Sequence, residues 1–422
     1  MELKIDDMSV EELEQALNGA EGGNAVELVG EMTVCERRQK SFLVGNRACR
    51  SLLTLRRPNL LIDGRNARIR FETESAPEND LNLLYLTKAA RNTQLQNLRI
   101  VFEHRGGDSG ACVRAIANSA YGLIAEHCSI EMTSDSQLSM TGIYNDGNLD
   151  TTLETPADCL RLNGNRIRIR CLPDQTDREI SVCCVSNRLS NSAEISGNDL
   201  TAVVSGSGER QRAVGIFNSG RYVRIIDNNV KANGSHSAGR QLEQAHTCAL
   251  ENHGDFLICT GNNLVGEWGG QCTGAYNEGL NVVFSANKIL ATHTIKGRAL
   301  ENAGAGSNIQ ANMIVSTSRN ARLLLNRADG VLIGGNALQV LMAAEECRSG
   351  CGILLENIQS CLIAGNRISG AHSCGIFLKH SGPVLEHNLI ERTEGLLFRE
   401  VADLQDHAIA AALDERRICS IE

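Results

Sequence analysis

The feature that most constrains this chain is a short phrase repeated along most of its length. In each copy a small residue and an asparagine stand between aliphatic residues, as in EISGNDL (194–200), ICTGNNL (258–264) and VLIGGNAL (331–338). The asparagines of successive copies are Asn165, Asn198, Asn228, Asn262, Asn287, Asn312, Asn336, Asn366 and Asn388. Their spacing, about 24 residues with insertions, is a solenoid period. It predicts one stack of coils rather than the two or three domains that 422 residues would suggest.

A second phrase precedes the first by about ten residues in several units. Its copies include GIYNDG (142–147), ALENHG (249–254), GAYNEG (274–279) and ALENAG (299–304). The apolar runs around both phrases are short, often alternate with polar residues and use Ile, Val and Leu, which indicates strands rather than helices. Each unit therefore reads strand, turn, strand, turn, strand. The chain is expected to be an all-β, single-stranded, right-handed parallel β-helix of roughly 13 coils.

The repeated asparagine has a structural explanation. A sharp bend between strands favours a residue that tolerates the left-handed conformation, and asparagine does so at low cost. When it stacks at the same corner of successive coils, its amide can hydrogen-bond to the next one and form a ladder. We therefore expect most of these asparagines to be structural.

The N-terminal end of the repeat is predicted to carry a helical cap. Residues 9–18 begin with Ser9 and Glu12 at the spacing of a capping box, and Val10, Leu13 and Leu17 share one face. We assign residues 1–24 to a capping helix that covers the first coil. The first clear coil is NLLIDGRNARIRF, at 59–71.

The repeat is expected to stop near Gly395. Residues 398–417 are expected to be helical, and 395–422 to form a C-terminal capping or oligomerisation segment. The intervening residues, 25–394, are predicted to form a single β-helix domain.

Charge and cysteine usage narrow the function classes. The net charge is −9, from 41 basic and 50 acidic residues, which argues against nucleic acid or an anionic membrane as a partner. The apolar runs are too short to span a membrane, and the start resembles no secretory signal, so a cytoplasmic location is expected. The 16 cysteines are scattered without zinc spacing, which predicts mostly buried free thiols, no structural disulfide, and no metal or other cofactor.

The strongest departure from the repeat follows a long insert at 231–247. Glu251, His253 and Asp255 lie within five residues, and Glu267 and Trp268 follow the next asparagine. Neighbouring carboxylates can divide acid and base roles, as glycoside hydrolysis requires, so Glu251, Asp255 and Glu267 are candidate catalytic residues. His253 could bind a sugar hydroxyl and Trp268 could stack on a sugar ring.

Neighbouring turns supply two further candidates and one structural alternative. Asp146 and Glu278 are predicted to share the turn phase of His253, either as substrate contacts or as solvated turn residues. Glu301 and Glu356 each precede an asparagine, as Glu251 does, and are expected in the same phase as Glu251. The Glu-Asn pair could therefore be a structural corner.

The stretches CALENHGDFLICTGNNL (248–264) and ARLLLNRADGVLIGGNAL (321–338) resemble the inulin fructotransferases and their relatives, the difructose-anhydride hydrolases. The resemblance implies a right-handed β-helix, a homotrimer with active sites in clefts between subunits, and metal-free cleavage of a fructosyl linkage by two carboxylates. Glu251 matches an acidic residue of the family's Glu-Asn-His stretch. The family's upstream aspartate has no counterpart here, where QLEQAHTCAL offers Glu243 instead.

These features favour an intracellular carbohydrate-active enzyme, a glycosidase or intramolecular fructosyl transferase acting on a small neutral glycan or a difructose anhydride. A lyase or epimerase of uronic acids is the first alternative, and it would need Lys or Arg side chains near its site and an acidic cluster for calcium. A non-catalytic scaffold is the second, and the low aromatic content of 3% favours it, because sugar sites usually stack on rings.

Overall fold

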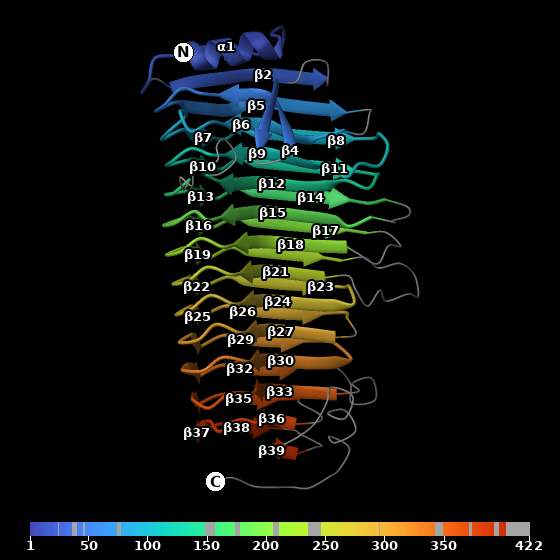
Figure 1. Cartoon of the computed structure of the whole chain (residues 1–422), viewed down its shortest axis with the longest axis vertical. Coiled ribbons are helices and arrows are strands. Elements are labelled where there is room, and N and C mark those ends of the chain that lie inside the picture. Colours follow the sequence, from blue (N-terminus) through green and yellow to red (C-terminus); the bar gives the residue numbers. More distant parts are fainter. Residues whose placement is uncertain are drawn as a thin grey trace. The chain divides into compact units, whose positions relative to one another are not determined.

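The computed structural model describes the chain except for residues 24, 36–39, 45–46, 74–76, 148–156, 174–177, 206–210, 235–245, 295, 342–348, 371–373, 392–395 and 402–422. The chain divides into two compact units. The first comprises Met1–Arg224 and Asn228–Val230, and the second Ile225–Asp227 and Lys231–Glu422. Figure 1 shows the strands in chain order.

Each complete coil contains three strands joined by two turns, as the repeat predicted. In the second unit, for example, β21 (His246–Asn252), β22 (Ile258–Thr260) and β23 (Asn263–Glu267) form one coil. They pair in parallel with β24 (Gln271–Asn277), β25 (Val283–Ser285) and β26 (Lys288–Thr292) of the next coil. The fold is therefore the predicted parallel β-helix, right-handed as nearly all parallel crossovers are.

The first strand of each coil belongs to a sheet that we call the front sheet of its unit. In the first unit its strands are β3 (Lys40–Val44), β4 (Arg47–Leu55), β6 (Asp80–Leu86), β9 (Cys112–Asn118), β12 (Ser139–Asp146), β15 (Ile180–Arg188) and β18 (Gln211–Asn218). In the second unit they are β21, β24, β27 (Lys296–Asn302), β30 (Asn320–Asn326), β33 (Ser349–Glu356), β36 (Cys374–Lys379) and β39 (Leu396–Val401).

The remaining strands form the other faces of the coils. From the N-terminus they are β1 (Glu2–Lys4), β2 (Ala25–Cys35), β5 (Leu61–Thr73), β7 (Gln94–Gln96), β8 (Arg99–His104), β10 (Ile124–Glu126), β11 (Ser129–Ser134), β13 (Arg161–Asn163), β14 (Arg166–Cys171), β16 (Glu194–Ser196), β17 (Asp199–Val204), β19 (Arg224–Ile226) and β20 (Asn229–Asn233). After β26 come β28 (Asn308–Gln310), β29 (Met313–Ser316), β31 (Val331–Gly334), β32 (Ala337–Val340), β34 (Cys361–Ala364), β35 (Arg367–Ser369), β37 (Val384–Glu386) and β38 (Leu389–Glu391).

The repeated asparagines form the predicted ladder in both units. Each Nδ2 donates to the Oδ1 of the next asparagine: Asn165 to Asn198 (2.9 Å) and Asn198 to Asn228 (2.8 Å), then Asn262 to Asn287 (2.9 Å), Asn287 to Asn312 (3.0 Å), Asn312 to Asn336 (3.0 Å), Asn336 to Asn366 (2.9 Å) and Asn366 to Asn388 (2.9 Å). We call this the corner ladder. Its amides satisfy polar groups that the interior of a coil hides from water.

The reason given above for these asparagines was partly wrong. The left-handed residue is not the asparagine but the one before it, such as Asp227 (φ 53°), Gly261 (φ 70°), Ala286 (φ 54°) and Ala311 (φ 53°). The asparagine is the first residue after the bend. Its Oδ1 also accepts the backbone N–H of the preceding ladder asparagine. The residue before it turns the chain, and the asparagine joins the coils.

A second ladder follows the GIYNDG-type phrase at the end of the front strands. In the second unit Asn252, Asn277, Asn302 and Asn326 are joined in turn by bonds of 2.7 Å. In the first unit Asn118, Asn145, Asn187 and Asn218 are joined by bonds of 2.7–2.8 Å. We call this the front ladder. The two ladders fix the register of successive coils.

The predicted N-terminal helix is confirmed. Helix α1 (Val10–Gly19) has Ser9 as its N-cap, with a reciprocal capping box to Glu12, and it buries Leu13 and Leu17. The carboxylate of Glu14 accepts from the backbone N–H of Thr54, so the helix is also bonded to the end of β4. The β-helix includes residues before the coil at 59–71, because β2 already pairs with β5.

At the C-terminus the repeat continues past Gly395. Strand β39 pairs in parallel with β36, so the helix predicted to begin at residue 398 is wrong for residues 398–401. The rest of that prediction lies outside the described residues.

The cysteines that the structure describes are free thiols, and all of them except Cys112 and Cys159 are buried, as predicted. Among the described residues, no helix is both long and apolar enough to cross a membrane.

Candidate functional site

The predicted Glu251 lies on β21, in the front sheet of the second unit. Its strand neighbours Leu250 and Asn252 are fully buried, so the alternation of a strand turns Glu251 to the outer face of the sheet. The residues paired in register with Glu251 along this face are Tyr276 on β24 and then Glu301 on β27. Glu251 is nevertheless only 9% exposed, because neighbouring side chains cover it.

One imidazole joins Glu251 to a second carboxylate. His253 Nε2 lies 3.1 Å from Glu251 Oε1, and His253 Nδ1 lies 2.6 Å from Glu278 Oε2. A neutral imidazole has a single N–H, whereas an imidazolium has two donors. Two carboxylates on opposite ring nitrogens therefore favour the protonated ring. We call Glu251, His253, Tyr276 and Glu278 the Glu–His–Glu cluster.

The electrostatics of the cluster agree with its geometry. The hydrogen bond to Glu251, reinforced by that to Glu278, raises the pKa of His253 above its ordinary value against the opposing effect of burial. The hydroxyl of Tyr276 donates to Glu278 Oε1, and this bond, together with His253, lowers the pKa of Glu278. Burial raises the pKa of Tyr276, which therefore stays protonated as a donor. The cluster thus holds one exchangeable proton between two carboxylates.

A second histidine borders Glu251. His246 Nε2 lies 3.9 Å from Glu251 Oε2, at the start of the same strand. His246 and Tyr276 were missed by the sequence analysis. The phrase AYNE, which puts a tyrosine two residues before the predicted Glu278, was a signal for Tyr276. His246 follows the insert and carries no comparable signal.

The other two carboxylates predicted to be catalytic have separate bonding partners. Asp255 Oδ1 accepts the backbone N–H of Leu280 in the next turn at 3.0 Å. Glu267 Oε2 lies 2.7 Å from Lys231 Nζ and accepts from Asn233 Nδ2 at 3.2 Å. These bonds join adjacent coils.

Two of the remaining predicted substrate contacts, Trp268 and Asp146, have other partners. Trp268 stacks on His293, with ring centroids 4.6 Å apart, and takes a left-handed φ of 58° after β23. Asp146 lies in the first unit, where its Oδ2 accepts from the hydroxyl of Tyr144 at 3.0 Å. Glu243 lies outside the described residues. Of the predicted residues that the structure describes in the second unit, Glu251, His253 and Glu278 are thus brought together.

Glu301 and Glu356 were both expected in the same phase as Glu251, and the structure confirms this for one of them. Glu301 shares the column of Glu251 through Tyr276. Glu356 does not, because the residue in register with Glu301 is Leu325 and the next is Leu354. Glu301 accepts from Arg298 Nη1 and Arg327 Nη1, each at 2.6 Å, in place of an imidazole.

Within the ranges that the structure describes, no group of three or more His, Cys, Asp or Glu side chains is arranged to hold a metal ion. The chemistry that the Glu–His–Glu cluster offers is proton transfer between carboxylates through an imidazole.

No family model matches this sequence, and no curated protein matches it. Several solved structures are similar. One is the A-module of a mannuronan C-5 epimerase from Azotobacter vinelandii, with 12% identity over 91% of this chain and 95% of that chain, at a TM-score of 0.42. Another is a mutant tailspike protein of an Escherichia coli bacteriophage in complex with a pentasaccharide, with 12% identity over 90% of this chain and 68% of that chain, at 0.48. A third is DFA-IIIase from Arthrobacter chlorophenolicus, with 12% identity over 90% of this chain and 87% of that chain, at 0.36. At these values the similarity concerns the fold alone.

Proposed function

We propose that this chain is a carbohydrate-active enzyme, a glycosidase or intramolecular glycosyl transferase, which acts on a small neutral glycan through Glu251 and Glu278. The observation that carries the proposal is the single imidazole hydrogen-bonded to both carboxylates. Cleavage of a glycosidic bond needs one group that gives a proton and one that takes a proton or attacks. The cluster contains two such groups and a shared proton.

The environments of the two carboxylates suggest their roles. The side chain of Glu278 is 47% exposed and its pKa is lowered, so Glu278 is ionised at neutral pH and suited to activate a nucleophile. The side chain of Glu251 is 11% exposed and bonded to the imidazole, so it can receive the proton of His253 and pass it to the leaving oxygen. Proton donation breaks the bond from the anomeric carbon to that oxygen. The nucleophile, deprotonated by Glu278, then bonds to the anomeric carbon.

We propose an external nucleophile rather than a covalent intermediate, since Glu278 is assigned the role of base. The imidazole of His253 lies between the two carboxylates, with bonds of 3.1 Å and 2.6 Å to them. Inverting enzymes hold their carboxyl groups about 6.5–9.5 Å apart to admit a water, whereas retaining enzymes hold them about 5–5.5 Å apart. A hydroxyl of the substrate in place of water would give the intramolecular transfer.

The experiment is a screen of the purified protein against neutral disaccharides and oligosaccharides, with products detected by mass. Difructose anhydrides and inulin come first, because of the resemblance at 248–264. Conversion of at least one neutral glycan by the wild type, lost in both Glu251→Gln and Glu278→Gln, supports the proposal. If both variants still convert the glycan, the catalytic residues lie elsewhere. If the wild type converts no glycan, the non-catalytic scaffold becomes the better interpretation. The trimer implied by the resemblance remains a prediction.

A further inference from the structure

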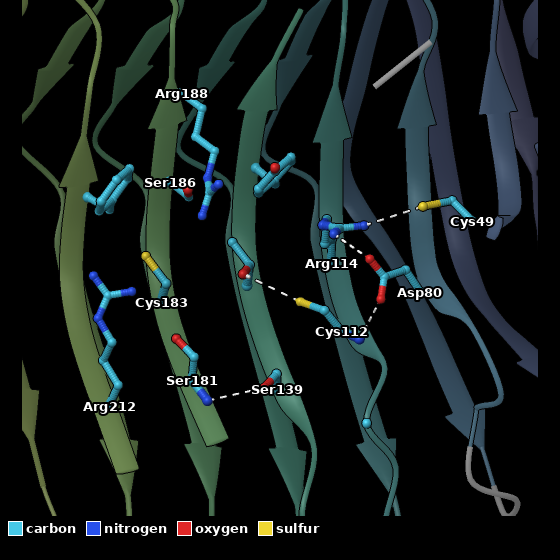
Figure 2. Close-up of a pocket in the computed structure, with 14 residues that line it drawn as sticks. Cys49, Asp80, Cys112, Arg114, Ser139, Ser181, Cys183, Ser186, Arg188 and Arg212 are labelled. Atoms are coloured by element: carbon cyan, nitrogen blue, oxygen red, sulfur yellow. Dashed lines mark hydrogen bonds and ion pairs between the residues drawn. The ribbon is translucent and has the colours of Figure 1, made fainter. Parts of the chain in front are cut away.

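The first unit contains a cavity of about 390 Å³ on its front sheet. Its lining comes from six strands, β4, β6, β9, β12, β15 and β18, together with Gly110 just before β9 (Figure 2). It shares no residue with the Glu–His–Glu cluster. Its volume lies near the lower end of the roughly 300–1,000 Å³ typical of ligand sites, which suits one or two sugar rings.

The cavity is basic although the chain is acidic. Its lining contains three arginines, Arg114, Arg188 and Arg212, and a single carboxylate, that of Asp80. Asp80 Oδ2 accepts from Arg114 Nη2 at 2.7 Å, with both side chains 9% exposed, so this carboxylate is already matched by one guanidinium. A second carboxylate, Asp146, borders the cavity through its bond to Tyr144. Among the described residues at the cavity, three arginines thus face two carboxylates.

The thiols of the cavity do not offset this charge. Cys49 and Cys112 both line it, and burial raises the pKa of each thiol above its ordinary value. Both therefore remain neutral at neutral pH. The lining also contains uncharged hydroxyl groups, among them those of Ser139, Thr141 and Ser181.

Two aromatic rings hold the guanidinium groups in place. Arg114 lies 4.5 Å from the centroid of the Tyr144 ring, and Arg188 lies 5.6 Å from the same centroid. Arg188 and Arg212 lie 5.3 Å and 5.7 Å from the centroid of Phe217. Such cation–π contacts orient the planar guanidinium over the ring. In Figure 2, Arg188 and Arg212 extend along the cavity from neighbouring strands.

We propose that this cavity binds a small anionic sugar, with Arg188 and Arg212 contacting its carboxylate or phosphate and the hydroxyls of Ser139 and Ser181 contacting the ring. Guanidinium groups match both anions because their paired N–H donors meet two oxygens at once. Arg114, which is 8% exposed and bonded to Asp80, positions the site from beneath rather than contacting the ligand directly. The basic residues that a site for acidic sugars requires are thus present in the first unit.

The test is isothermal titration calorimetry of the full chain with digalacturonate, glucose 6-phosphate and maltose. We expect digalacturonate or glucose 6-phosphate to bind at least tenfold more tightly than maltose, and the stronger of the two identifies the anion as carboxylate or phosphate. The affinity should fall as salt is added, because the contact is ionic. Equal affinity for maltose and the anionic sugars, or no binding of either anion, would overturn the proposal.

Variants then locate the binding. Arg188→Gln and Arg212→Gln should each weaken the anionic sugar about tenfold or more, the size of one lost charge-assisted contact. Arg99→Gln is the matched control, because Arg99 lies on β8 with 48% of its side chain exposed and outside the cavity lining. Wild-type affinity in both cavity variants would refute the assignment. Glu251→Gln should bind the anion normally, so this proposal and the proposed function fail independently.

Discussion

Glu251 and Glu301 occupy the same column of one front sheet, two coils apart, yet their surroundings differ in one respect. Both are nearly buried, 9% and 4% exposed, and both precede an asparagine of the front ladder. Glu251 is bonded to the imidazole of His253, whereas Glu301 is bonded to the guanidinium groups of Arg298 and Arg327. The repeat fixes where the carboxylate lies, and the cationic partner decides what it can do.

The difference between the partners is one of proton exchange. A guanidinium is always charged and gives up no proton near neutral pH, so the arginines hold Glu301 as a fixed ion. An imidazole titrates near neutrality and can pass a proton to a carboxylate. Glu301 is therefore suited to structure, and Glu251 to acid–base chemistry.

The largest expected difference between substitutions at Glu251 and Glu301 is in kcat. Glu251→Gln should lower kcat on the glycan found by the screen by about 10²-fold or more, the usual contribution of a general acid or base. Glu301→Gln should leave kcat within about twofold, since Glu301 holds no exchangeable proton. Steady-state kinetics on both variants, with circular dichroism to check folding, measures the difference. Equal losses in the two would remove the distinction between them.

For the free energy of unfolding, we expect the larger loss at Glu301 and the smaller loss at Glu251. Glu301→Gln removes a carboxylate that accepts from two arginines and should cost about 1–3 kcal/mol, since hydrogen bonds to charged groups are the stronger ones and partial exposure of the arginines weakens them. Glu251→Gln keeps a side chain that can still accept from His253 and should cost less. Urea unfolding of both variants gives the comparison, and a larger loss for Glu251→Gln would contradict it.

The sequence alone predicted the fold because its main signal is periodic. The strand lengths, the corner ladder and the capped helix α1 all follow from local patterns that recur or have a fixed spacing. The left-handed position was misassigned by one residue, because glycine, aspartate and asparagine are all common in bends and spacing does not show which of two neighbours turns. The phase of Glu356 was wrong because it was taken from the Glu-Asn phrase alone. Glu356 stands ten residues before the corner-ladder asparagine of its coil, whereas Glu251 and Glu301 stand eleven residues before theirs, so the phrase does not keep a fixed position in the coil.

The candidate site was predicted only in part, for a similar reason. Glu251, His253 and Glu278 were all named, since they break the repeat visibly. The bridge through one imidazole depends on exact register between coils and could not be read from spacing. The arginines of the cavity come from strands separated by inserts of unequal length, so Arg114, Arg188 and Arg212 show no common spacing in the sequence.

The register on which the comparison of Glu251 with Glu301 depends can be tested through the ladders. Asn312, in the corner ladder, is 1% exposed, donates to Asn336 Oδ1 and the carbonyl of Phe284, and accepts from Asn287. Asn312→Ala leaves these buried groups without partners and should cost about 1–3 kcal/mol. Thermal or urea unfolding measures it. Unchanged stability here and at Asn287→Ala would show that the ladders do not maintain the register.

The smallest effect, and the most direct, is the titration of His253. Its pKa is raised above the ordinary 6.5, chiefly by the hydrogen bond to Glu251. Nitrogen-15 NMR of the ring should therefore show His253 titrating above 6.5 in the wild type and lower in Glu251→Gln, with Glu301→Gln unchanged.

The sign of this shift also fixes a pH dependence of stability. Because the folded-state pKa is raised, the stability that protonated His253 contributes is fully present below pH 6.5 and is lost as the pH rises through the folded-state pKa. The stability difference between wild type and Glu251→Gln should then shrink as the pH rises from 6.5. A difference that grows with pH, or a His253 that titrates at or below 6.5 in the wild type, would mean that the imidazole is not held as a cation between the two carboxylates. Glu251 would then have no proton source that Glu301 lacks.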